Sequence, residues 1–211
     1  MAEIWSVPRL WPGKTVVCVA GGPSLDLAQV RRVAIARRQD RIRVIAINDA
    51  VYPCWWADVL FASDHRWWLK HDMVPGFRGL KVAISNARGS LGGTPGIRFV
   101  ENTGCDGLET KPTGIRTGRN GGYQALNLGV HFGPKRIVLL GYDMMLGPDG
   151  QAHWFGEHED WVLKERTIEN VFLPAFVGMA KQLRKLGVEV INATPGSALN
   201  VFPKAKLEAV I

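Results

Sequence analysis

The sequence has no long apolar run: no stretch reaches the roughly 18 consecutive apolar residues that a membrane-spanning helix requires. Its start, Met1 to Trp5, has neither the basic residues nor the apolar core of a secretory signal, so we expect a cytoplasmic protein. Internal repeats and low-complexity tracts are also missing, which does not suit a repeat array or a disordered tail. We therefore expect an ordinary folded domain with no membrane span.

Cysteine is scarce. Cys18, Cys54 and Cys105 are the three cysteines of the chain, and they lie far apart without a C-x-x-C pair. This spacing suggests neither a disulfide framework nor a structural metal site. We expect three reduced thiols and no resident metal.

The common phosphate-binding signatures, G-x-G-x-x-G and G-x-x-x-x-G-K-[ST], are absent. A glycine-rich turn nevertheless follows the apolar segment 15–20 directly, with the residues Gly21, Gly22, Pro23 and Ser24. Such a turn lets backbone N–H groups approach a phosphate, and a following helix points its positive end at that phosphate. The turn is therefore a candidate nucleotide site; the alternative is an ordinary strand-to-helix turn with Ser24 as helix N-cap.

The 211 residues, 46% of them hydrophobic, suit one globular domain with a substantial core. Positive charge exceeds negative charge, with a net charge of +7 and a pI of about 9.6. This balance favours either an anionic small substrate or contact with nucleic acid. The basic residues gather in two groups: Arg31, Arg32, Arg37, Arg38, Arg41 and Arg43, and then Lys181, Arg184 and Lys185.

Short apolar segments alternate with helical patterns along the chain. This alternation predicts a single Rossmann-like nucleotide-binding domain over 1–211, of α/β class, with a mostly parallel sheet of about six or seven strands and helices on both faces. The candidate strands are 15–20, 43–47, 58–62, 81–84, 97–100, 136–141 and 188–192, and the candidate helices are 25–38, 121–132 and 161–186.

Three local signals refine this prediction. Pro174 lies inside the last helical pattern and predicts a kink or a split there, and Gly187 is a candidate C′ residue at its end. The segment 85–119 is rich in Gly, Pro, Thr and Arg and lacks helical periodicity. We interpret it as a long loop or lid region with one short strand.

In open α/β sheets, ligands bind outside the carboxyl ends of the strands. Polar residues recur at these ends in the predicted sheet, so we expect them to share one site. The Gly121–Gly122 pair precedes a helical pattern and is a candidate for a second anionic group, with Asn120 as an N-cap in the alternative interpretation. The candidate binding residues are Gly21, Gly22, Pro23, Ser24, Asn48, Ser63, Asp64, Gly121, Gly122, Asp143, Thr194 and Ser197.

The segment from Gly150 to Trp161 combines histidines, acids and aromatic residues. His153, Glu157 and His158 are candidates for general acid–base catalysis, because imidazole titrates near neutral pH. A metal site is the alternative, although the spacing matches neither H-E-x-x-H nor H-x-x-E-H. The pairs Trp55–Trp56 and Trp67–Trp68 suit either base stacking or the hydrophobic core.

The order of these motifs, over about residues 14–202, resembles a known superfamily. Its members are the bacterial sialyltransferases that use CMP-sialic acid, the archaeal-type 6-hydroxymethylpterin diphosphokinases, and uncharacterised phage proteins. The family's base histidine falls at Glu157 here, and His158 follows it. The matching segments are Ala20–Leu25, Asn48, Gly121–Gly122, Gly141–Asp143, His153–Gly156 and Thr194–Ala198.

The resemblance implies a Rossmann-like nucleotide-binding fold and group transfer from an activated nucleotide. The leading hypothesis is a glycosyltransferase that uses a nucleotide-sugar donor, needs no cofactor, and modifies a small molecule, a glycan or DNA. In this hypothesis the turn from Gly21 to Ser24 holds the donor phosphate. Asn48 with Ser63 or Asp64 holds the base and ribose, and His153 or His158, with Glu157, deprotonates the acceptor hydroxyl.

Two alternatives stay open. The first is a diphosphokinase that transfers pyrophosphate from ATP and needs Mg²⁺, held by Asp64 or Asp143. The second is a non-catalytic protein that binds nucleic acid or takes part in virion assembly, in which the basic charge and the tryptophans carry the function. Assembly into a homo-oligomer also stays open, because the sequence does not decide it.

Overall fold

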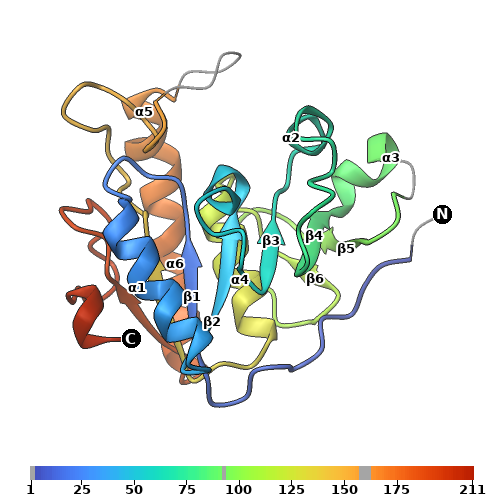
Figure 1. Ribbon diagram of the computed structural model, residues 1–211, viewed down its shortest axis with the longest axis horizontal. Helices are drawn as coiled ribbons and strands as arrows, with labels where there is room; N and C mark the ends of the chain where they lie inside the picture. Colours follow the sequence, from blue (N-terminus) through green and yellow to red (C-terminus); the bar gives the residue numbers. More distant parts are fainter. Residues whose placement is uncertain (1–2, 92–93, 157–162) are drawn as a thin grey trace.

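The computed structural model describes residues 3–91, 94–156 and 163–211. They form a sheet of eight parallel strands in the order β6-β5-β4-β3-β2-β1-β7-β8 (Figure 1). The predicted α/β, Rossmann-like class is confirmed, and the short strand β6 makes the sheet one strand larger than expected. The strands are β1 (Thr15–Val19), β2 (Ile42–Ile47), β3 (Val59–Phe61), β4 (Leu80–Ile84), β5 (Ile97–Asn102), β6 (Gly114–Ile115), β7 (Arg136–Leu140) and β8 (Glu189–Asn192).

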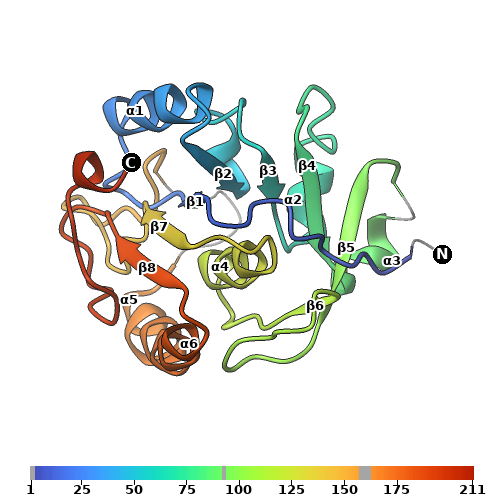
Figure 2. The same ribbon diagram turned by 90° about the horizontal axis from the view of Figure 1, so that it is seen from below.

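Helices cover both faces of the sheet, as predicted: α1 packs on one face, and α4 and α6 pack on the other (Figure 2). Among the described residues, no helix is both long enough and apolar enough to cross a membrane. The α-helices are α1 (Leu27–Arg38), α2 (His65–Lys70), α3 (Arg88–Leu91), α4 (Gly121–His131), α5 (Glu165–Thr167) and α6 (Leu173–Lys185). The shorter helical segments are η1 (Asn48–Val51), η2 (Ser85–Ala87), η3 (Ile168–Phe172) and η4 (Leu207–Ala209).

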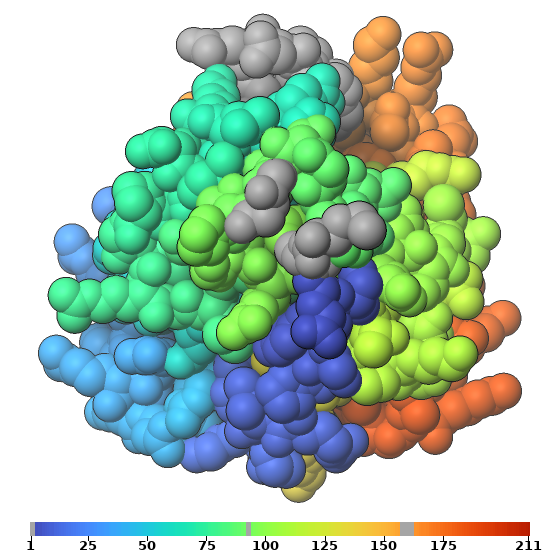
Figure 3. Space-filling view, turned by 90° about the vertical axis from the view of Figure 1, so that its right-hand side faces the viewer, coloured from blue at the N-terminus to red at the C-terminus, as the bar shows by residue number. Residues whose placement is uncertain are grey.

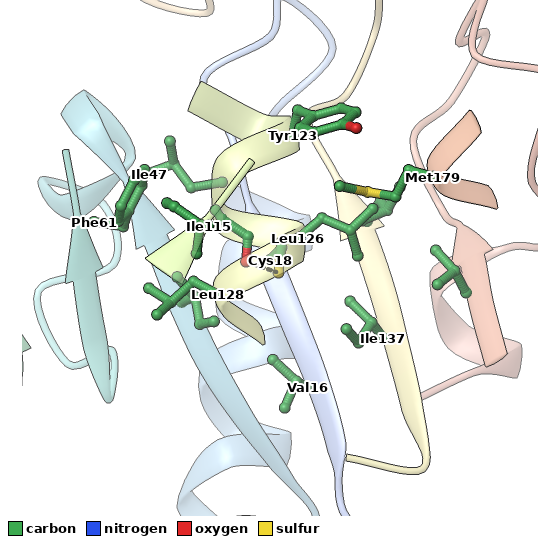
Figure 4. Close-up of a cluster of buried hydrophobic side chains, with 14 of the residues drawn as sticks. Val16, Cys18, Ile47, Phe61, Ile115, Tyr123, Leu126, Leu128, Ile137 and Met179 are labelled. Carbon is green, nitrogen blue, oxygen red and sulfur yellow. Dashed lines mark hydrogen bonds between the residues drawn. The ribbon is translucent and has the colours of Figure 1, made fainter. Parts of the chain in front are cut away.

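The central strand β1 shows how the sequence builds two cores. Successive side chains of a strand point to opposite faces, so Val16 and Cys18 join the core beneath α4 and α6, whereas Val17 and Val19 join the core beneath α1. All four side chains are fully buried. Figure 4 shows the first of these cores, with Val16 and Cys18 among side chains of α4, α6 and the neighbouring strands. Burial on both faces explains the continuous apolar run of this strand.

The segment 85–119 is more regular than the predicted loop or lid. It contains η2, α3, β5 and β6, and its strands extend the parallel sheet. The N-terminal segment lies along this edge, where Trp5 N–H donates to the Phe99 carbonyl at 2.7 Å and Val7 N–H donates to the Pro112 carbonyl at 2.9 Å (Figure 3). The strand β5 corresponds to the predicted strand 97–100, whereas the polar composition of the segment hid β6, because a two-residue strand has no periodicity of its own.

The predicted kink or split at Pro174 takes the form of a change of helix type. The π-helical segment η3 ends at Phe172 and α6 begins directly at Leu173, so the helical backbone continues past Pro174, which has no N–H to donate to the preceding turn. Gly187, with a φ of +71°, follows the last turn of α6 as predicted. Its N–H donates to the Arg184 carbonyl, and Val188 N–H donates to the Leu183 carbonyl. These two bonds form a Schellman motif, which ends the helix.

The strand order reverses at β1, because β2 lies on one side of it and β7 on the other. The connection after β1 leads to β2 on one side, and the connection after β7 leads to β8 on the other, so a crevice opens outside the carboxyl ends of these strands. The loops after β1, β2 and β7 meet there. The fold therefore brings together the turn after Val19, the segment after Ile47 and the segment after Leu140.

Candidate functional site

A cavity of about 130 Å³ lies in this crevice. Most pockets for small ligands measure ~300–1,000 Å³, so the described residues enclose only part of a nucleotide-sized ligand. The cavity is lined by the loops after β1, β2 and β7, the start of α4 and the segment around His153. The predicted site residues that line it are Gly21, Gly22, Pro23, Asn48, Gly121, Gly122, Asp143 and His153.

The turn after β1 is held by the loop after β7. Gly22 N–H donates to the Gly141 carbonyl at 3.0 Å, and Ser24 N–H donates to Oδ1 of Asp143 at 2.9 Å. A Cβ on Gly22 would fall 1.9 Å from Oδ2 of Asp143 and 2.5 Å from the Gly141 carbonyl oxygen. Glycine is therefore required at position 22 because of the neighbouring loop, whether or not a phosphate binds there.

This arrangement changes the expected role of the turn. The N–H groups of Gly22 and Ser24 are already bonded within the protein, and Pro23 has none. The Gly21 N–H is then the one donor of the turn without a hydrogen bond to the described residues. The turn thus offers a phosphate one backbone N–H group instead of a ring of them.

The helix that follows the turn is also capped. Its first residue is Leu27 and its N-cap is Asp26, so the alternative with Ser24 as N-cap is wrong. Asp26 Oδ1 accepts the Gln29 N–H at 2.8 Å, and the Gln29 side chain accepts the Asp26 N–H at 3.0 Å. This capping box satisfies the N–H groups of Asp26 and Gln29. The Asp26 side chain therefore already occupies part of the positive end of α1.

The first turn of α4 is a better place for an anion. Asn120 is its N-cap, as the alternative interpretation of the sequence had it, and its side chain accepts the Tyr123 N–H at 3.1 Å. Gly121 and Gly122 follow and line the cavity. The first N–H groups of a helix have no partner inside the helix and carry its positive dipole end. The Gly121–Gly122 pair therefore supplies the donors that the turn after β1 does not.

Asp143 is the most unusual group of the site. Only 5% of it is exposed, and its Oδ2 atom has no hydrogen-bond partner among the described residues. Burial raises the pKa of Asp143, and the bonds from Ser24 only partly oppose this rise. The next residue, Met144, has a φ of +50°, a strained conformation for a non-glycine residue. A buried oxygen without a partner, beside a cavity, is suited to hold a proton, a cation or a ligand donor.

The segment 152–156 covers the turn after β1. Trp154 N–H donates to the Gly21 carbonyl at 3.1 Å, so residues far apart in sequence come together here. The His153 ring stacks on Phe155, with ring centroids 5.1 Å apart and planes inclined by 5°. His153 is therefore the predicted acid–base candidate that the structure places at the cavity. Glu157 and His158 lie outside the described residues.

Ser63 and Asp64 do not line the cavity. Asp64 is the N-cap of α2: its Oδ1 accepts the Arg66 N–H, and its Oδ2 lies 2.9 Å from Nη2 of Arg66. Burial raises the pKa of Asp64, but the bonds and charge of Arg66 outweigh this and hold it below its ordinary value. The carboxylate thus caps a helix and pairs with an arginine.

Thr194 and Ser197 are buried and also lie outside the cavity lining. Oγ1 of Thr194 accepts the Tyr142 N–H at 2.9 Å, and the Ser197 hydroxyl donates to the Tyr142 carbonyl at 2.6 Å. Both peptide groups of Tyr142 are therefore fixed from the end of β8. These hydroxyl groups therefore help to position Asp143, the next residue.

The tryptophans mostly belong to the protein's own packing. Trp68 is fully buried and donates from Nε1 to the Ala62 carbonyl at 3.0 Å. Trp67 donates from Nε1 to Oδ2 of Asp49 at 3.0 Å. Trp56 is partly buried against the core, whereas 43% of Trp55 is exposed. The core interpretation therefore holds for three of these four side chains, and Trp55 lies edge-on to Phe77 with part of its surface exposed.

The predicted basic group around α1 is partly neutralised. Arg37 pairs with Asp58 at 3.0 Å, Arg32 with Glu208 at 3.2 Å, and Arg43 with Asp40 at 2.5 Å. These pairs reduce the positive charge that this face presents to a polyanion.

The charge of the cavity differs from that of the whole protein. Among its described lining residues there is no Lys or Arg, and the titratable side chains are Asp49, Tyr142, Asp143 and His153. Within the described ranges, no group of three or more His, Cys, Asp and Glu side chains is arranged to hold a metal ion. Asp49 lies two residues after the end of β2, and sequence spacing alone does not indicate its contact with Trp67.

No family model matches the sequence, and a search of curated proteins finds no match. The function is therefore inferred from the fold and from the geometry of the cavity.

Proposed function

We propose that the protein is a nucleotide-dependent transferase that uses a nucleotide-sugar donor. The observation that carries this proposal is the cavity at the point where the strand order reverses, lined by Gly21 and by the first turn of α4. Ligands of open parallel sheets bind at such points, and helix N-termini bind phosphate groups. The donor phosphate then lies between the Gly21 N–H and the Gly121–Gly122 pair.

The remaining lining residues have roles that suit this reaction. Asn48 has an amide for the base or ribose of the donor, and a Cβ on Gly121 would lie 3.6 Å from Nδ2 of Asn48. His153 lies over Gly21 and takes the proton of the acceptor hydroxyl. Backbone N–H groups in a fixed position stabilise the charge that develops on the leaving phosphate.

The first experiment is a thermal-shift screen with CMP, UDP, GDP and ATP, followed by calorimetry of each nucleotide that stabilises the protein. Stabilisation grows with ligand concentration by mass action, about 2.7 kcal/mol at 100 times the dissociation constant. We expect one nucleotide to bind. If none of the four shifts the melting temperature at millimolar concentration, the proposal is wrong.

The second experiment places the nucleotide. A Cβ at Gly21 would meet His153, Trp154 and Phe155 at 3.8 Å, an ordinary contact distance, so the fold tolerates Gly21→Ala. The larger Gly21→Val fills the cavity and should weaken nucleotide binding at least tenfold. Gly178→Ala, on the exposed face of α6, is the matched control, and unchanged affinity in a folded Gly21→Val variant would move the site elsewhere.

The third experiment concerns the acid–base group. Removal of a general base typically lowers the rate about 10²–10⁴-fold. We expect His153→Ala to lose turnover and keep donor affinity, while His158→Ala changes little. The reverse result would assign the role of general base to His158. Near-native turnover in both variants would show that the segment from His153 to His158 has no acid–base role.

A second candidate is the Mg²⁺-dependent diphosphokinase, and the charge of the cavity favours it. Among the described residues, two carboxylates and no Lys or Arg line the cavity, so a polyphosphate would meet negative charge unless a divalent cation accompanied it. Asp143, with its unpartnered Oδ2, is the carboxylate that would hold this cation. Turnover that survives EDTA supports the glycosyltransferase; turnover that EDTA abolishes and Mg²⁺ restores supports the diphosphokinase.

A further inference from the structure

One side of the cavity is apolar, and the function above gives it no role. Three segments form it: the loop after β7, the segment 152–156, and the chain that leads through α5 and η3 into α6. Figure 1 shows α5 beyond the carboxyl ends of the strands. The large apolar residues that these segments contribute to the lining, which we call the apolar wall, are Met144, Met145, Phe155, Leu163, Ile168 and Phe172.

The last of these segments turns its apolar residues toward the cavity. Ile168 and Phe172 are four residues apart in η3, and both are buried and line the cavity. The polar residues around them are exposed and do not belong to the lining: Lys164, Glu165, Arg166, Glu169 and Asn170. Turns of π-helix such as η3 are rare and frequently lie at functional sites. The segment therefore has a polar outer face and an apolar face on the cavity.

The apolar wall also reaches solvent. Met145 is 46% exposed and Phe155 is 38% exposed, although both line the cavity. Pockets for small molecules are lined mainly by apolar and aromatic side chains, which a bound ligand removes from water. The unbranched thioether chain of methionine adapts to ligands of different shape. These two side chains are therefore suited to cover the apolar part of a ligand.

The apolar wall begins beside the groups that carry the proposed reaction. A Cβ on Gly21 would lie 3.8 Å from Nδ1 of His153 and 3.8 Å from Cε1 of Phe155. The His153 and Phe155 rings stack, with centroids 5.1 Å apart. The donor phosphate is proposed to bind at Gly21, and His153 is the proposed base. A molecule bound on the apolar wall therefore has its near end next to both groups.

Few polar side chains on this side of the cavity are placed to bind a sugar. A hydroxyl group that is buried without a hydrogen-bond partner costs free energy, so a sugar with several hydroxyl groups needs several partners. Among the described residues of the three segments, the polar side chains that line the cavity are Tyr142, Asp143 and His153. The Tyr142 hydroxyl already donates to the Gly122 carbonyl at 2.9 Å, and Oδ2 of Asp143 is buried. This side of the cavity therefore suits one reacting hydroxyl group on an apolar skeleton.

We propose that the acceptor of the transferase is an apolar alcohol, with a single hydroxyl group on an aliphatic or aryl carbon skeleton, and that the apolar wall binds this skeleton. This inference rests on the proposed function. The hydroxyl oxygen of the acceptor bonds to the anomeric carbon of the donor sugar while the bond from that carbon to the phosphate oxygen breaks. The phosphate leaves with the electron pair of that bond, and His153 takes the acceptor proton. The product is a glycoside of the alcohol.

The first test needs no donor and no activity. The chain contains five methionines, of which Met144 and Met145 belong to the apolar wall, whereas Met73 and Met179 do not line the cavity. In protein labelled with carbon-13 at the methionine methyl groups, 1-hexanol and benzyl alcohol should shift the Met144 and Met145 signals in a saturable way. Glycerol and methyl glucoside should not shift these signals, and the Met73 and Met179 signals should stay unchanged throughout.

Two results of this titration would overturn the inference. One is an equal shift of the Met145 signal with all four compounds, because the site would then not distinguish an apolar alcohol from a polar one. The other is the absence of a saturable Met145 shift with either apolar alcohol, because the apolar wall would then bind neither skeleton.

The second test changes the apolar wall in the full-length protein. Met145→Gln keeps the length of the side chain and makes its end polar, and Val177→Gln, at an equally exposed position on α6 (46%), is the matched control. With the nucleotide-sugar that the protein binds, Met145→Gln should raise KM for the apolar alcohol on the order of fivefold and leave donor affinity within about twofold of the wild type. Met145→Leu stays apolar and should keep the wild-type KM. An unchanged KM in Met145→Gln would show that the apolar wall does not bind the acceptor.

The inference and the proposed function fail in different ways. A nucleotide that displaces the apolar alcohols from Met145 would show that the apolar wall holds the base of the donor. Transfer to glycerol or methyl glucoside but not to the apolar alcohols would also overturn the inference, and in both cases the proposed function stands. A saturable Met145 shift in a protein that binds none of the nucleotides is instead the failure of the proposed function, and it leaves the apolar wall as a binding site for alcohols without a transfer.

Discussion

Asp143 and Gly22 lie so close together that a Cβ on Gly22 would fall 1.9 Å from Oδ2 of Asp143. The two residues belong to the loops after β7 and β1, and Asp143 also accepts the Ser24 N–H at 2.9 Å. This contact joins the two loops that line the cavity. The shape of the site therefore depends on a glycine and a buried carboxylate that are far apart in the sequence.

The first prediction follows directly from this contact. Gly22→Ala should destabilise the protein by about 2–3 kcal/mol, because overpacking against Asp143 and the Gly141 carbonyl forces the loops apart. Gly21→Ala should change the free energy of unfolding by less than ~1 kcal/mol, since its Cβ meets atoms only at 3.8 Å. Urea unfolding of both variants measures the difference, and equal stability of the two would contradict the packing of the loops.

The second prediction concerns the pH dependence of stability. Burial raises the pKa of Asp143, so the folded protein holds this proton more tightly than the unfolded chain. The free energy of unfolding should therefore fall as the pH rises from the ordinary value of 3.8 through the raised pKa, and then become level. Asp143→Asn keeps an acceptor for the Ser24 N–H but cannot titrate. The decrease in the free energy of unfolding with rising pH should therefore be smaller in this variant than in the wild type. Thermal unfolding between pH 3.5 and 7 gives the comparison.

For Asp143→Asn, Asp26→Asn is a suitable control because it removes a carboxyl group at the nearby exposed N-cap of α1. Asparagine is as good an N-cap as aspartate, so the helix should keep its cap. If the pH profile of Asp143→Asn matches that of the wild type, the carboxyl group titrates normally and is not desolvated.

The third prediction tests the end of α6. Gly187 has a φ of +71°, and no atom lies within 4 Å of the place that a Cβ would take. Gly187→Ala should therefore lower the free energy of unfolding by about 1–2 kcal/mol through backbone strain alone. Gly178 also has open space around it but lies inside α6, where alanine is favoured by ~0.5–1 kcal/mol. The two substitutions should therefore change the melting temperature in opposite directions. A shift of the same sign in both would refute the Schellman motif.

The fourth prediction concerns thiol reactivity. Burial raises the pKa of Cys18 and of Cys54 to about 12, whereas Cys105 is only half-buried. At pH 8 the two buried thiols have a thiolate fraction on the order of 10⁻⁴, and the thiolate is the reactive form. Iodoacetamide should label Cys105 first in the native protein and all three cysteines after denaturation. Mass spectrometry of the labelled peptides locates each adduct, and early labelling of Cys18 would show that β1 is not buried.

Several elements were predictable because their signals are local. The apolar runs 15–20, 43–47 and 136–141 correspond to β1, β2 and β7, the three strands around the cavity. Asn120 begins α4 and Gly187 ends α6, since caps depend on the residue types at one helix end. Pro174 separates η3 from α6 for the same reason.

Other elements were not predictable because they depend on partners far away in the sequence. The strand β6 exists through its pairing with β5, and nothing in its two residues indicates a strand. Thr194, Ser197 and Asp64 are polar residues at strand ends, as expected, but their side chains bond to backbone or to Arg66 instead of lining the cavity. The sequence shows which residues at a strand end are polar, but it does not show in which direction their side chains point.

The sequence by itself determined the class of the fold. The spacing of apolar residues and the residue types at helix ends act over a few residues, and these signals are repeated many times along the chain. It also determined where polar groups gather, since parallel strands bring their carboxyl ends to one edge. Only the tertiary structure decided which of these groups face the cavity. The Gly22–Asp143 contact and the hydrogen bond from Trp67 to Asp49 each join segments whose separation is set by packing. Distances of this kind depend on the packing of the whole core, so they cannot be predicted from a local sequence pattern.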